Sequence, residues 1–391
     1  MKHLVIRNLG PLRSVDINIG KVNLIIGLQS SGKSCVLKTA CYCAWVEKRI
    51  ELNQSAEAFA NGSAFIDGML AYYKMKSYAA DDTYIEYQTP YMKFSYSHKE
   101  KVFSFSWGER HWDYRKAKIS YVPSDRNLVA AIPAWSKLSL NYDNLLDFMD
   151  DWNVARRFSA DSGKILNLGI AYDYDAAQNV DHVKLQNGKR LRLTEGSSGI
   201  QSLVPLFVHL NYLSNGLYKD DSHPVFSYEE KEARRTLLST IYRNVNAGQC
   251  SAGADGVVSK VVDGMDFTFS NSKLADEFER LTRNFLNYDH NEIFLEEPED
   301  NLFPTTQSQL VDWLLYSALN EKRADMLFVA THSPYILNEF LKDGAEELNV
   351  FLTSPVASAE GMYDVRCLTR EECSDVYANG VDLFFNFESY S

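Results

Sequence analysis

Short apolar runs with alternating polar positions open the chain, and this pattern predicts β-strands. Residues 4–6 and 15–19 form two such runs, separated by turn-forming residues at 8–11. The apolar run 22–26 predicts a third, buried strand, and helix-compatible residues follow the next turn to about Ile50. The start of the chain therefore predicts strands that lead into a strand–loop–helix unit.

Aromatic and polar residues alternate again at 83–107 and predict antiparallel strands. The stretch from about 127 to 160 carries apolar residues at helical spacing, which predicts a helical lobe. Strand-like patterns return at 165–195, where an Asn-Gly pair marks a hairpin turn. We expect the next helix to begin at residue 197.

The stretch from about 214 to 290 is polar and rich in Asp, Ser and Asn, so we interpret it as an insertion with its own helices and a hairpin. From residue 291 onward, strand-like and helix-like segments alternate, which is typical of an α/β fold. Together the patterns predict a single α/β domain over 1–391, built from a sheet core, an antiparallel β subdomain, a helical lobe and the insertion.

Residues 27–34 spell G-x-x-x-x-G-K-S between the predicted buried strand and its helix. In that position backbone N–H groups and the positive end of the helix dipole converge on one point, which suits phosphate. Lys33 can reach the outer phosphates of ATP, and the Ser34 hydroxyl can ligate Mg²⁺. The predicted ATP-binding residues of this loop are Gly27, Gln29, Ser30, Ser31, Gly32, Lys33 and Ser34.

Two carboxylates and a histidine follow two later predicted strands. Glu296 and Glu297 come directly after the apolar run 291–295, and His332 follows the run 325–330. Beside a phosphate loop, one carboxylate can hold Mg²⁺ and the next can orient or deprotonate the attacking water. A histidine on the neighbouring strand can reach the γ-phosphate. The sequence thus predicts Glu296 as a metal ligand, and Glu297 and His332 as catalytic residues.

Four segments, taken in chain order, resemble the motifs of ABC-type ATPases. Residues 27–34 resemble the Walker A motif and 197–201 the signature, while 295–299 resemble the Walker B motif with the D-loop and 331–335 the H-loop. Their Ser-Ser-Gly-x-Gln, Glu-Glu-Pro-Glu and Thr-His-Ser-Pro forms are similar to the soluble OLD, RecF and SMC-like branch, not to transporter subunits. The resemblance covers nearly the whole chain outside the insertion and implies an ABC-ATPase head that uses ATP and Mg²⁺.

The signature segment implies a site that a second copy of the chain completes. Its Ser-Gly pair matches the family's Leu-Ser-Gly-Gly-Gln signature, which contacts the ATP held by the other subunit. The residues that this resemblance adds to the ATP-binding set are Ser197, Ser198, Gly199 and Gln201. Asp300 would lie in the D-loop, which crosses the dimer interface.

Two features depart from the family pattern. Glu296 stands where many ABC proteins carry Asp, a change that this branch tolerates. No glutamine matches the Q-loop, whose expected place is taken by residues 123–126. Three roles stay open for Arg126: contact with phosphate, contact with the partner lobe, or pairing with Asp125.

Composition narrows the setting in which the chain works. The net charge of −12 argues against a surface coated for sequence-independent nucleic-acid binding, although a local basic groove stays open. No apolar stretch reaches the roughly 20 residues that span a bilayer. The six cysteines lack metal-ligand or disulfide-framework spacing. We therefore expect a cytoplasmic protein with no membrane partner.

The leading hypothesis is an ATP-dependent switch. ATP would bring two copies together as a homodimer or higher homo-oligomer, hydrolysis would release them, and an effector protein would respond to the state. The stretch after His332 is too short for the TOPRIM nuclease that often follows OLD-like ATPases, so we expect a nuclease or toxin in trans, as in phage-defence systems.

Other classes of function are kept as alternatives. One is a RecF or SMC-like repair or clamp ATPase that binds DNA, which the net charge weakens. Another is an ATP-binding scaffold without turnover, which would leave Glu297 without a role. A transporter subunit is disfavoured by the insertion and by the missing Q-loop glutamine.

Overall fold

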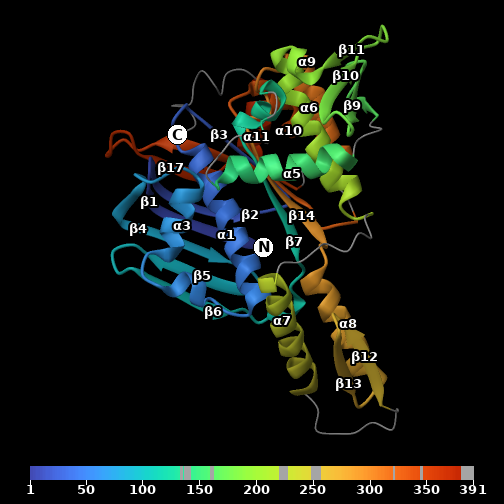
Figure 1. Ribbon diagram of the computed structural model, residues 1–391. Coiled ribbons are helices and arrows are strands. Elements are labelled where there is room, and N and C mark those ends of the chain that lie inside the picture. Colours follow the sequence, from blue (N-terminus) through green and yellow to red (C-terminus); the bar gives the residue numbers. More distant parts are fainter. Residues whose placement is uncertain are drawn as a thin grey trace.

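The computed structural model describes residues 1–132, 135, 142–158, 163–219, 228–247, 257–319, 322–343 and 347–379. Within these residues an eleven-stranded sheet forms the centre of the molecule (Figure 1). Its strands, in spatial order, are β6 (Val102–Trp107), β5 (Met92–Ser97), β4 (Ala79–Gln88), β1 (Lys2–Leu9), β2 (Leu12–Ile19), β17 (Tyr363–Cys367), β16 (Leu348–Pro355), β3 (Val22–Gly27), β15 (Met326–Ala330), β14 (His290–Glu296) and β7 (Ala117–Val122).

The sheet has a parallel part and an antiparallel part. Strands β16, β3, β15, β14 and β7 run parallel. The carboxyl ends of β3, β14 and β15 therefore lie at one edge of the sheet, and they lead into the phosphate loop (residues 27–34), the acidic pair and His332, respectively. Strands β1, β2, β4, β5 and β6 pair antiparallel. The predicted α/β class and antiparallel strands are confirmed, and β17 joins the two parts because it pairs with both β16 and β2.

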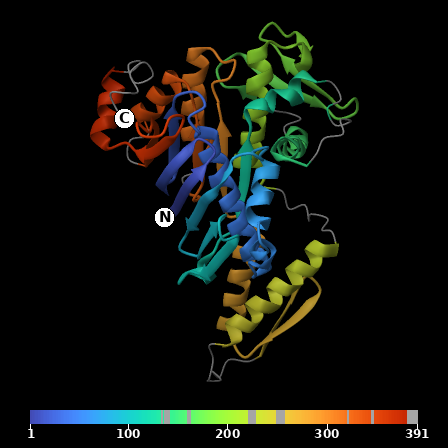
Figure 2. The same ribbon diagram turned by 90° about the vertical axis from the view of Figure 1, so that its left-hand side faces the viewer.

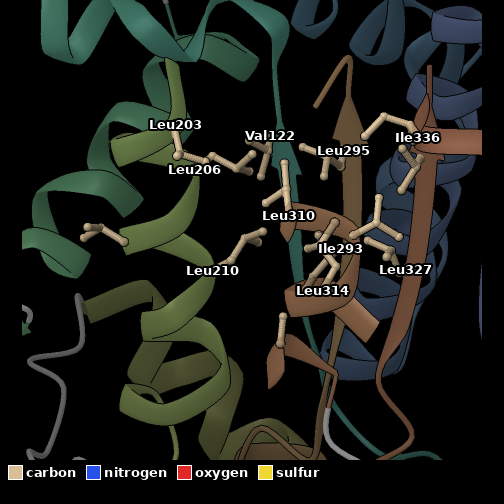
Figure 3. Packing of buried hydrophobic residues seen from close by; sticks show 14 of the residues in the cluster. Val122, Leu203, Leu206, Leu210, Ile293, Leu295, Leu310, Leu314, Leu327 and Ile336 are labelled. Atoms are coloured by element: carbon tan, nitrogen blue, oxygen red, sulfur yellow. The ribbon is translucent and has the colours of Figure 1, made fainter. Parts of the chain in front are cut away.

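Helices cover both faces of the sheet, as the alternation of side chains along β14 requires. Phe294 points to the face covered by α1 (Lys33–Asn53), α2 (Glu57–Ala60) and α3 (Ala64–Tyr72). Ile293 and Leu295 point to the other face, which is covered by α6 (Ser198–Asn211), α9 (Pro304–Trp313) and α10 (Pro334–Asp343) (Figure 3). Burial on both faces explains why the central strands are almost continuously apolar.

A lobe of helices and short strands packs against the second face. It contains α4 (Leu128–Ala131), α5 (Asn144–Phe158) and a four-stranded antiparallel sheet of β8 (Lys164–Ile165), β9 (Ile170–Asp175), β10 (Val180–Lys184) and β11 (Arg190–Arg192). The strands predicted at 165–195 are present, and residues 133–134, 136–141 and 159–160 of the predicted lobe lie outside the described residues. Helix α6 begins within one residue of its predicted start, with Ser197 at the N-cap.

The predicted insertion forms an arm that projects from the body (Figures 1 and 2). The arm consists of α7 (Tyr228–Ala247), β12 (Val258–Val262), β13 (Met265–Phe269) and α8 (Ser272–Leu286), so the expected helices and hairpin are present. Aromatic residues such as Phe267 and Phe278 pack within the arm, and Phe285 joins this cluster to Trp112 and Tyr114 of the body. The predicted boundaries need correction, because His290 already belongs to β14 and residues 212–216 continue α6 as a π-turn.

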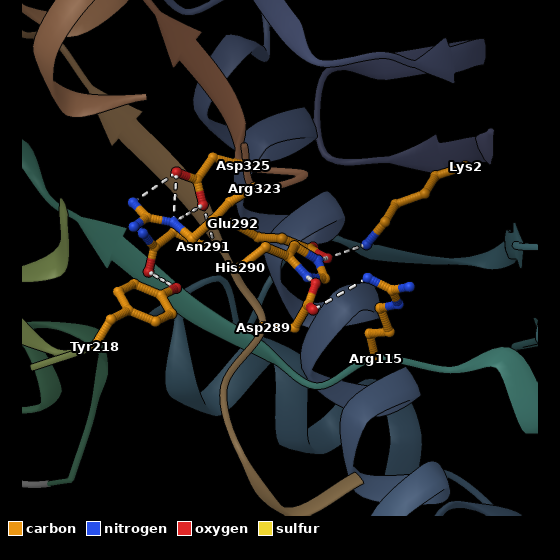
Figure 4. A network of polar contacts seen from close by, with 9 residues as sticks. All are labelled: Lys2, Arg115, Tyr218, Asp289, His290, Asn291, Glu292, Arg323 and Asp325. Carbon is orange, nitrogen blue, oxygen red and sulfur yellow. Dashed lines mark hydrogen bonds and ion pairs between the residues drawn. The ribbon is translucent and has the colours of Figure 1, made fainter. Parts of the chain in front are cut away.

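Polar contacts fix the point where the arm joins the sheet (Figure 4). The backbone N–H of Asn291 donates to Asp325 Oδ1 at 2.8 Å, and Lys2 bonds to Glu292. Although burial opposes it, Lys2 and His290 lower the pKa of Glu292 to about 2, so this buried carboxyl is ionised and paired. The arm therefore runs through α8 into the anchored start of β14, the strand that leads to the predicted metal ligand Glu296 and the predicted catalytic Glu297.

Candidate functional site

Glycines at both ends of the phosphate loop are required by its backbone. Gly27 has φ 152° and Gly32 has φ 94°, values that side-chain-bearing residues rarely adopt. A Cβ at Gly27 would lie 1.7 Å from Thr353 Oγ1, and a Cβ at Gly32 would lie 2.5 Å from Leu12 Cδ2. The loop therefore packs tightly against β16 and the β1–β2 turn, which holds its backbone in one shape.

The beginning of α1 offers free backbone donors to this loop. The first N–H groups of a helix have no intrahelical acceptor, and here the first helical bond runs from Val36 N–H to the Gly32 carbonyl at 3.0 Å. The Lys33 ammonium lies over the loop and donates to the carbonyls of Gly27 at 3.1 Å and Leu28 at 2.7 Å. Backbone donors and an ammonium group thus converge on the same point, as an anion site requires.

Glu296 and Glu297 stand at the end of β14, beside the loop. Glu296 is buried, accepts a hydrogen bond from Tyr121 Oη at 2.5 Å and lies 3.6 Å from Lys38 Nζ. Glu297 has φ 43°, a left-handed conformation that costs about 1–2 kcal/mol and is held by its N–H bond to the Ala330 carbonyl. The strained backbone turns the two successive carboxylates to different partners.

His332 approaches Glu297 from the neighbouring strand. Its Nε2 lies 3.3 Å from Glu297 Oε1, and this contact lowers the pKa of Glu297, which keeps the carboxylate ionised. The main chain of His332 is held by Glu299, whose Oε1 accepts the His332 N–H at 2.6 Å. Glu299 is the last residue of the Glu-Glu-Pro-Glu motif, but its sequence position alone indicated no role for it. Its part is to position the histidine, and burial raises its own pKa.

One cavity of about 450 Å³ brings these groups together. The predicted residues that line it are Gln29, Ser30, Ser31, Gly32, Lys33, Ser34, Glu296, Glu297 and His332. Gly27 contributes its carbonyl to Lys33 just beneath them. The cavity offers enough protein oxygens for Mg²⁺, because this ion takes one or two of them and completes its shell with phosphates and water. Ser34 and Glu296 both line the cavity and could supply such oxygens.

Several solved structures align with most of this chain at very low sequence identity and with TM-scores below 0.5. The SMC head domain from Thermotoga maritima is 10% identical, with 94% of this chain and 98% of that chain covered and a TM-score of 0.41. An Smc head domain with an extended coiled coil, bound to the C-terminal domain of ScpA derived from Pyrococcus furiosus, is 9% identical, with coverages of 97% and 99% and a TM-score of 0.41.

The recombination mediator protein RecF, solved with ATPrS, is 10% identical, with 93% of this chain and 97% of that chain covered and a TM-score of 0.30. No protein-family model matches the chain, and no curated protein is significantly similar to it. At such identities function has to be inferred from the residues of this chain.

The predicted signature residues do not line the cavity. Ser197 and Ser198 stand exposed at the start of α6, and a Cβ at Gly199 would lie 2.9 Å from the Asn301 carbonyl. Gln201 turns back and donates from Nε2 to the Thr194 carbonyl at 3.0 Å. Within one copy these residues are therefore apart from the phosphate loop, and their predicted contact with ATP depends on a second copy.

Arg126 has a role that none of the three expectations described. Its fully buried guanidinium donates from Nη1 to the Glu296 carbonyl at 2.9 Å and from Nη2 to the Glu297 carbonyl at 2.8 Å. A third bond, at 3.2 Å, reaches the carbonyl of Pro123. Arg126 thus does not pair with Asp125 or face the phosphate loop. It binds the main-chain carbonyls of Glu296 and Glu297, where β14 ends.

We expect Arg126→Met to impair turnover more than ATP affinity. The change removes three charge-assisted hydrogen bonds from buried carbonyls, and such bonds contribute about 1.5–3 kcal/mol each when a charged group takes part. The protein should lose at least about 3 kcal/mol of unfolding free energy in urea, and kcat should fall because Glu297 is no longer held. Unchanged stability and kcat would contradict this role for Arg126, and Arg235→Met on the surface of α7 serves as the control.

ATP affinity is expected to decrease as the pH rises above 8. Burial lowers the pKa of Lys33 to about 8, against the opposing effect of Glu297 and Glu299. Above that pH the free protein holds a neutral amine, so ATP binding must take up a proton and weakens by up to about tenfold per pH unit. Calorimetry between about pH 7.5 and 9.5, in buffers of different ionisation heat, measures both effects. A flat affinity without proton uptake would contradict the assignment.

Among the helices in the described part of the chain, none is both long and apolar enough to span a bilayer.

Proposed function

We propose that the chain binds ATP with Mg²⁺ in the 450 Å³ cavity and hydrolyses it to ADP and phosphate. The observation that carries this proposal is the meeting of a phosphate loop, two strand-end carboxylates and a histidine, from three neighbouring parallel strands, around one cavity. Scaffolds that bind nucleotide without turnover need the loop alone. The acidic pair and His332 are the additional groups that hydrolysis requires.

Each residue has a task that its surroundings support. Lys33 and the N–H groups at the start of α1 bind the phosphates, and Ser34 with Glu296 holds Mg²⁺, which offsets phosphate charge when bound. Glu297 is ionised and orients the attacking water and accepts its proton. His332 lies beside Glu297 and would donate a hydrogen bond to the γ-phosphate of bound ATP. Tyr121 and Lys38 keep the Glu296 side chain in place.

Phosphate release from ATP by the purified chain, with and without Mg²⁺, tests this proposal. We expect activity that requires Mg²⁺ and that rises more than linearly with protein concentration, because two copies are needed. A folded protein that binds no ATP in calorimetry would contradict the whole proposal. Binding without phosphate release would favour the scaffold alternative instead.

We further propose that ATP binds between two copies of the chain. Ser198 and Gly199 lie at a helix N-terminus, a position suited to phosphate, yet they stand outside the cavity of their own copy. Asn301 of the D-loop links this helix to the acidic pair, since its Nδ2 donates to Ser202 Oγ at 3.0 Å. A head-to-head dimer would place each signature against the other copy's phosphate loop.

Ser198→Arg is expected to keep ATP binding and to reduce hydrolysis by at least about a hundredfold. The bulky cation would occupy the space of the other copy's nucleotide, while the phosphate loop of its own copy is untouched. Nucleotide affinity by calorimetry and phosphate release measure the two effects. Ser374→Arg, on an exposed helix serine of α11 (Arg370–Asn379), is the matched control. Normal turnover by Ser198→Arg would indicate a monomeric ATPase.

A partner protein that responds to the ATP state completes the proposed function, and in the reading favoured by the sequence it is a nuclease or toxin of a phage-defence system. The arm supports a partner role because it projects from the body and connects directly to β14 (Figures 1 and 2). The DNA-binding alternative gains no support from the basic residues near 115–118, since Lys118 is paired with Asp151 at 2.8 Å and Arg115 with Asp289 at 3.3 Å. Purification of the chain from its native cells, with identification of what remains bound, distinguishes these readings.

A further inference from the structure

A second cavity, of about 440 Å³, lies next to the proposed ATP cavity. It is enclosed by α1, α3, β7 and the residues just before α5. Its size is within the range of small-molecule sites, which hold ligands of mononucleotide size and are lined mainly by apolar and aromatic groups. Six aromatic residues line it: Tyr42, Trp45, Tyr72, Tyr73, Tyr121 and Tyr142.

The rings form two contacting pairs in the wall of this cavity. Tyr42 and Trp45 on α1 stack with centroids 5.5 Å apart, and the centroids of Tyr72 and Tyr142 are 5.9 Å apart. Trp45 and Tyr142 are partly exposed and form the rim, with exposed fractions of 41% and 72%. Ala71 on α3 adds no bulk at the rim, which leaves room for a planar ring to stack.

The charged groups of this cavity indicate what such a ring would carry. Lys48 lines the wall without a carboxylate in ion-pair range in the described part of the chain, and its ammonium lies 5.1 Å from the centre of the Tyr288 ring. Burial lowers the pKa of Lys48, against an opposing effect of Tyr288. Lys118 already pairs with Asp151. Lys48 is therefore the group that an anionic substituent would neutralise.

The cavity wall also contains a carboxyl group, that of Asp147, as an acceptor. Asp147 on α5 accepts a hydrogen bond from Tyr72 Oη at 2.9 Å and keeps its second oxygen for another donor. Burial and the neighbouring Asp151 raise its pKa. Ring N–H or amino groups of a heteroaromatic base are suitable donors for this side. An aliphatic anion would satisfy Lys48 but would leave the ring walls and Asp147 unused.

The cavity is connected to the ATP site through two tyrosines. Tyr73 lines both cavities and packs against Tyr121 with ring centroids 5.2 Å apart. Tyr121 in turn lines the second cavity and donates its hydroxyl to Glu296. A ligand that shifts the Tyr121 ring would therefore move a donor of the predicted Mg²⁺ ligand.

We propose that this second cavity is a regulatory site for a nucleotide other than the hydrolysed ATP, with its base stacked between the aromatic walls, its amino edge on Asp147 and its phosphate on Lys48. The binding part stands independently of the proposed ATPase activity, whereas the regulatory part rests on it. Occupancy would alter the Mg²⁺ requirement of hydrolysis through Tyr121.

Binding is tested in the Lys33→Ala protein, in which the phosphate loop no longer binds nucleotide. We expect AMP or GMP to bind with Kd between about 1 μM and 1 mM by calorimetry, and adenosine or guanosine more weakly. Adding Lys48→Gln should lower nucleotide affinity at least about tenfold and leave nucleoside affinity unchanged. Adding Ala71→Trp should fill the cavity and remove both.

Several results would overturn the site. One is that neither AMP nor GMP binds saturably to folded Lys33→Ala protein. Another is that adding Lys48→Gln leaves the nucleotide affinity unchanged. A third is that nucleotide still binds after Ala71→Trp and also after Trp45→Ala. Two cavity variants are used so that a folding defect in one, detected by thermal unfolding, leaves the other decisive. Tight binding of an aromatic peptide in place of nucleotides would assign the cavity to a protein partner and also overturn the proposal.

Regulation is tested with the wild-type chain by titrating Mg²⁺ in the ATPase assay with and without the nucleotide that binds. We expect its half-saturating Mg²⁺ concentration to change at least about threefold. Ala71→Trp should keep the basal rate and lose the response. If the nucleotide binds as described yet leaves the Mg²⁺ dependence unchanged, the regulatory part is wrong. If no basal ATPase exists, the proposed function has failed while the binding result still stands.

Discussion

Glu297→Gln is expected to bind ATP nearly as well as wild type and to hydrolyse it at least about a hundredfold more slowly. General acid–base catalysis contributes a rate factor of about a hundred or more, which this variant would lose. The amide has the shape of the carboxylate but cannot accept the proton of the attacking water. The positive φ of residue 297 and the bond from Arg126 to its carbonyl are main-chain features, so the substitution leaves them in place. Single-turnover phosphate release and nucleotide affinity, measured on the same preparation, separate chemistry from binding.

The matched control is Glu277→Gln, which makes the same change on α8, where the carboxylate pairs with Arg280 on the surface. That variant should keep the wild-type rate. If Glu297→Gln hydrolyses ATP normally while Glu296→Gln does not, the roles of the two carboxylates are reversed. If both variants are active, the acidic pair is not catalytic.

Lys33→Ala should abolish ATP binding, with an affinity loss of at least about a hundredfold. The ammonium lies over the loop, bonded to two of its carbonyls, and lines the cavity where phosphates would bind, so its loss removes charge-assisted bonds of about 1.5–3 kcal/mol each. The carbonyls of Gly27 and Leu28 would also lose their partner beside an anionic ligand.

Calorimetry with ATP and Mg²⁺ measures the effect, and thermal unfolding shows whether the variant is folded. Lys93→Ala is the control, because that lysine is exposed and pairs with Glu86 far along the sheet, on β5. Wild-type affinity in folded Lys33→Ala protein would remove the basis for assigning residues 27–34 to phosphate.

The parts of the site that the sequence predicted are those whose chemistry is local. The phosphate loop is set within a few residues by β3, two glycines and the start of α1, so its pattern is visible in a short stretch. Glu296, Glu297 and His332 could be proposed from the sequence as well, because each stands at or just after the end of an apolar strand. Their meeting in one cavity depends on β14 and β15 pairing beside β3, which is a long-range event.

The parts that the sequence analysis missed depend on main-chain partners far away in the chain. Arg126 binds carbonyls about 170 residues further on, and no pattern of side chains indicates an acceptor that belongs to the backbone. Glu299 is part of a motif in the sequence, but only the fold shows that its carboxylate accepts a hydrogen bond from the His332 N–H. The boundary of the arm was misjudged because the polar residues His290 and Asn291 begin a buried strand, where Asp325 satisfies the backbone of Asn291.

The central claim is that each ATP is hydrolysed between two copies of the chain, and mixing two inactive variants tests it most directly. Lys33→Ala lacks a working phosphate loop and Ser198→Arg lacks a working signature, so neither should hydrolyse ATP alone. A mixed dimer combines the intact loop of one with the intact signature of the other, so an equimolar mixture should regain on the order of a quarter of the wild-type rate. A mixture that stays as inactive as its components, although both are folded and Ser198→Arg binds ATP, would contradict the claim.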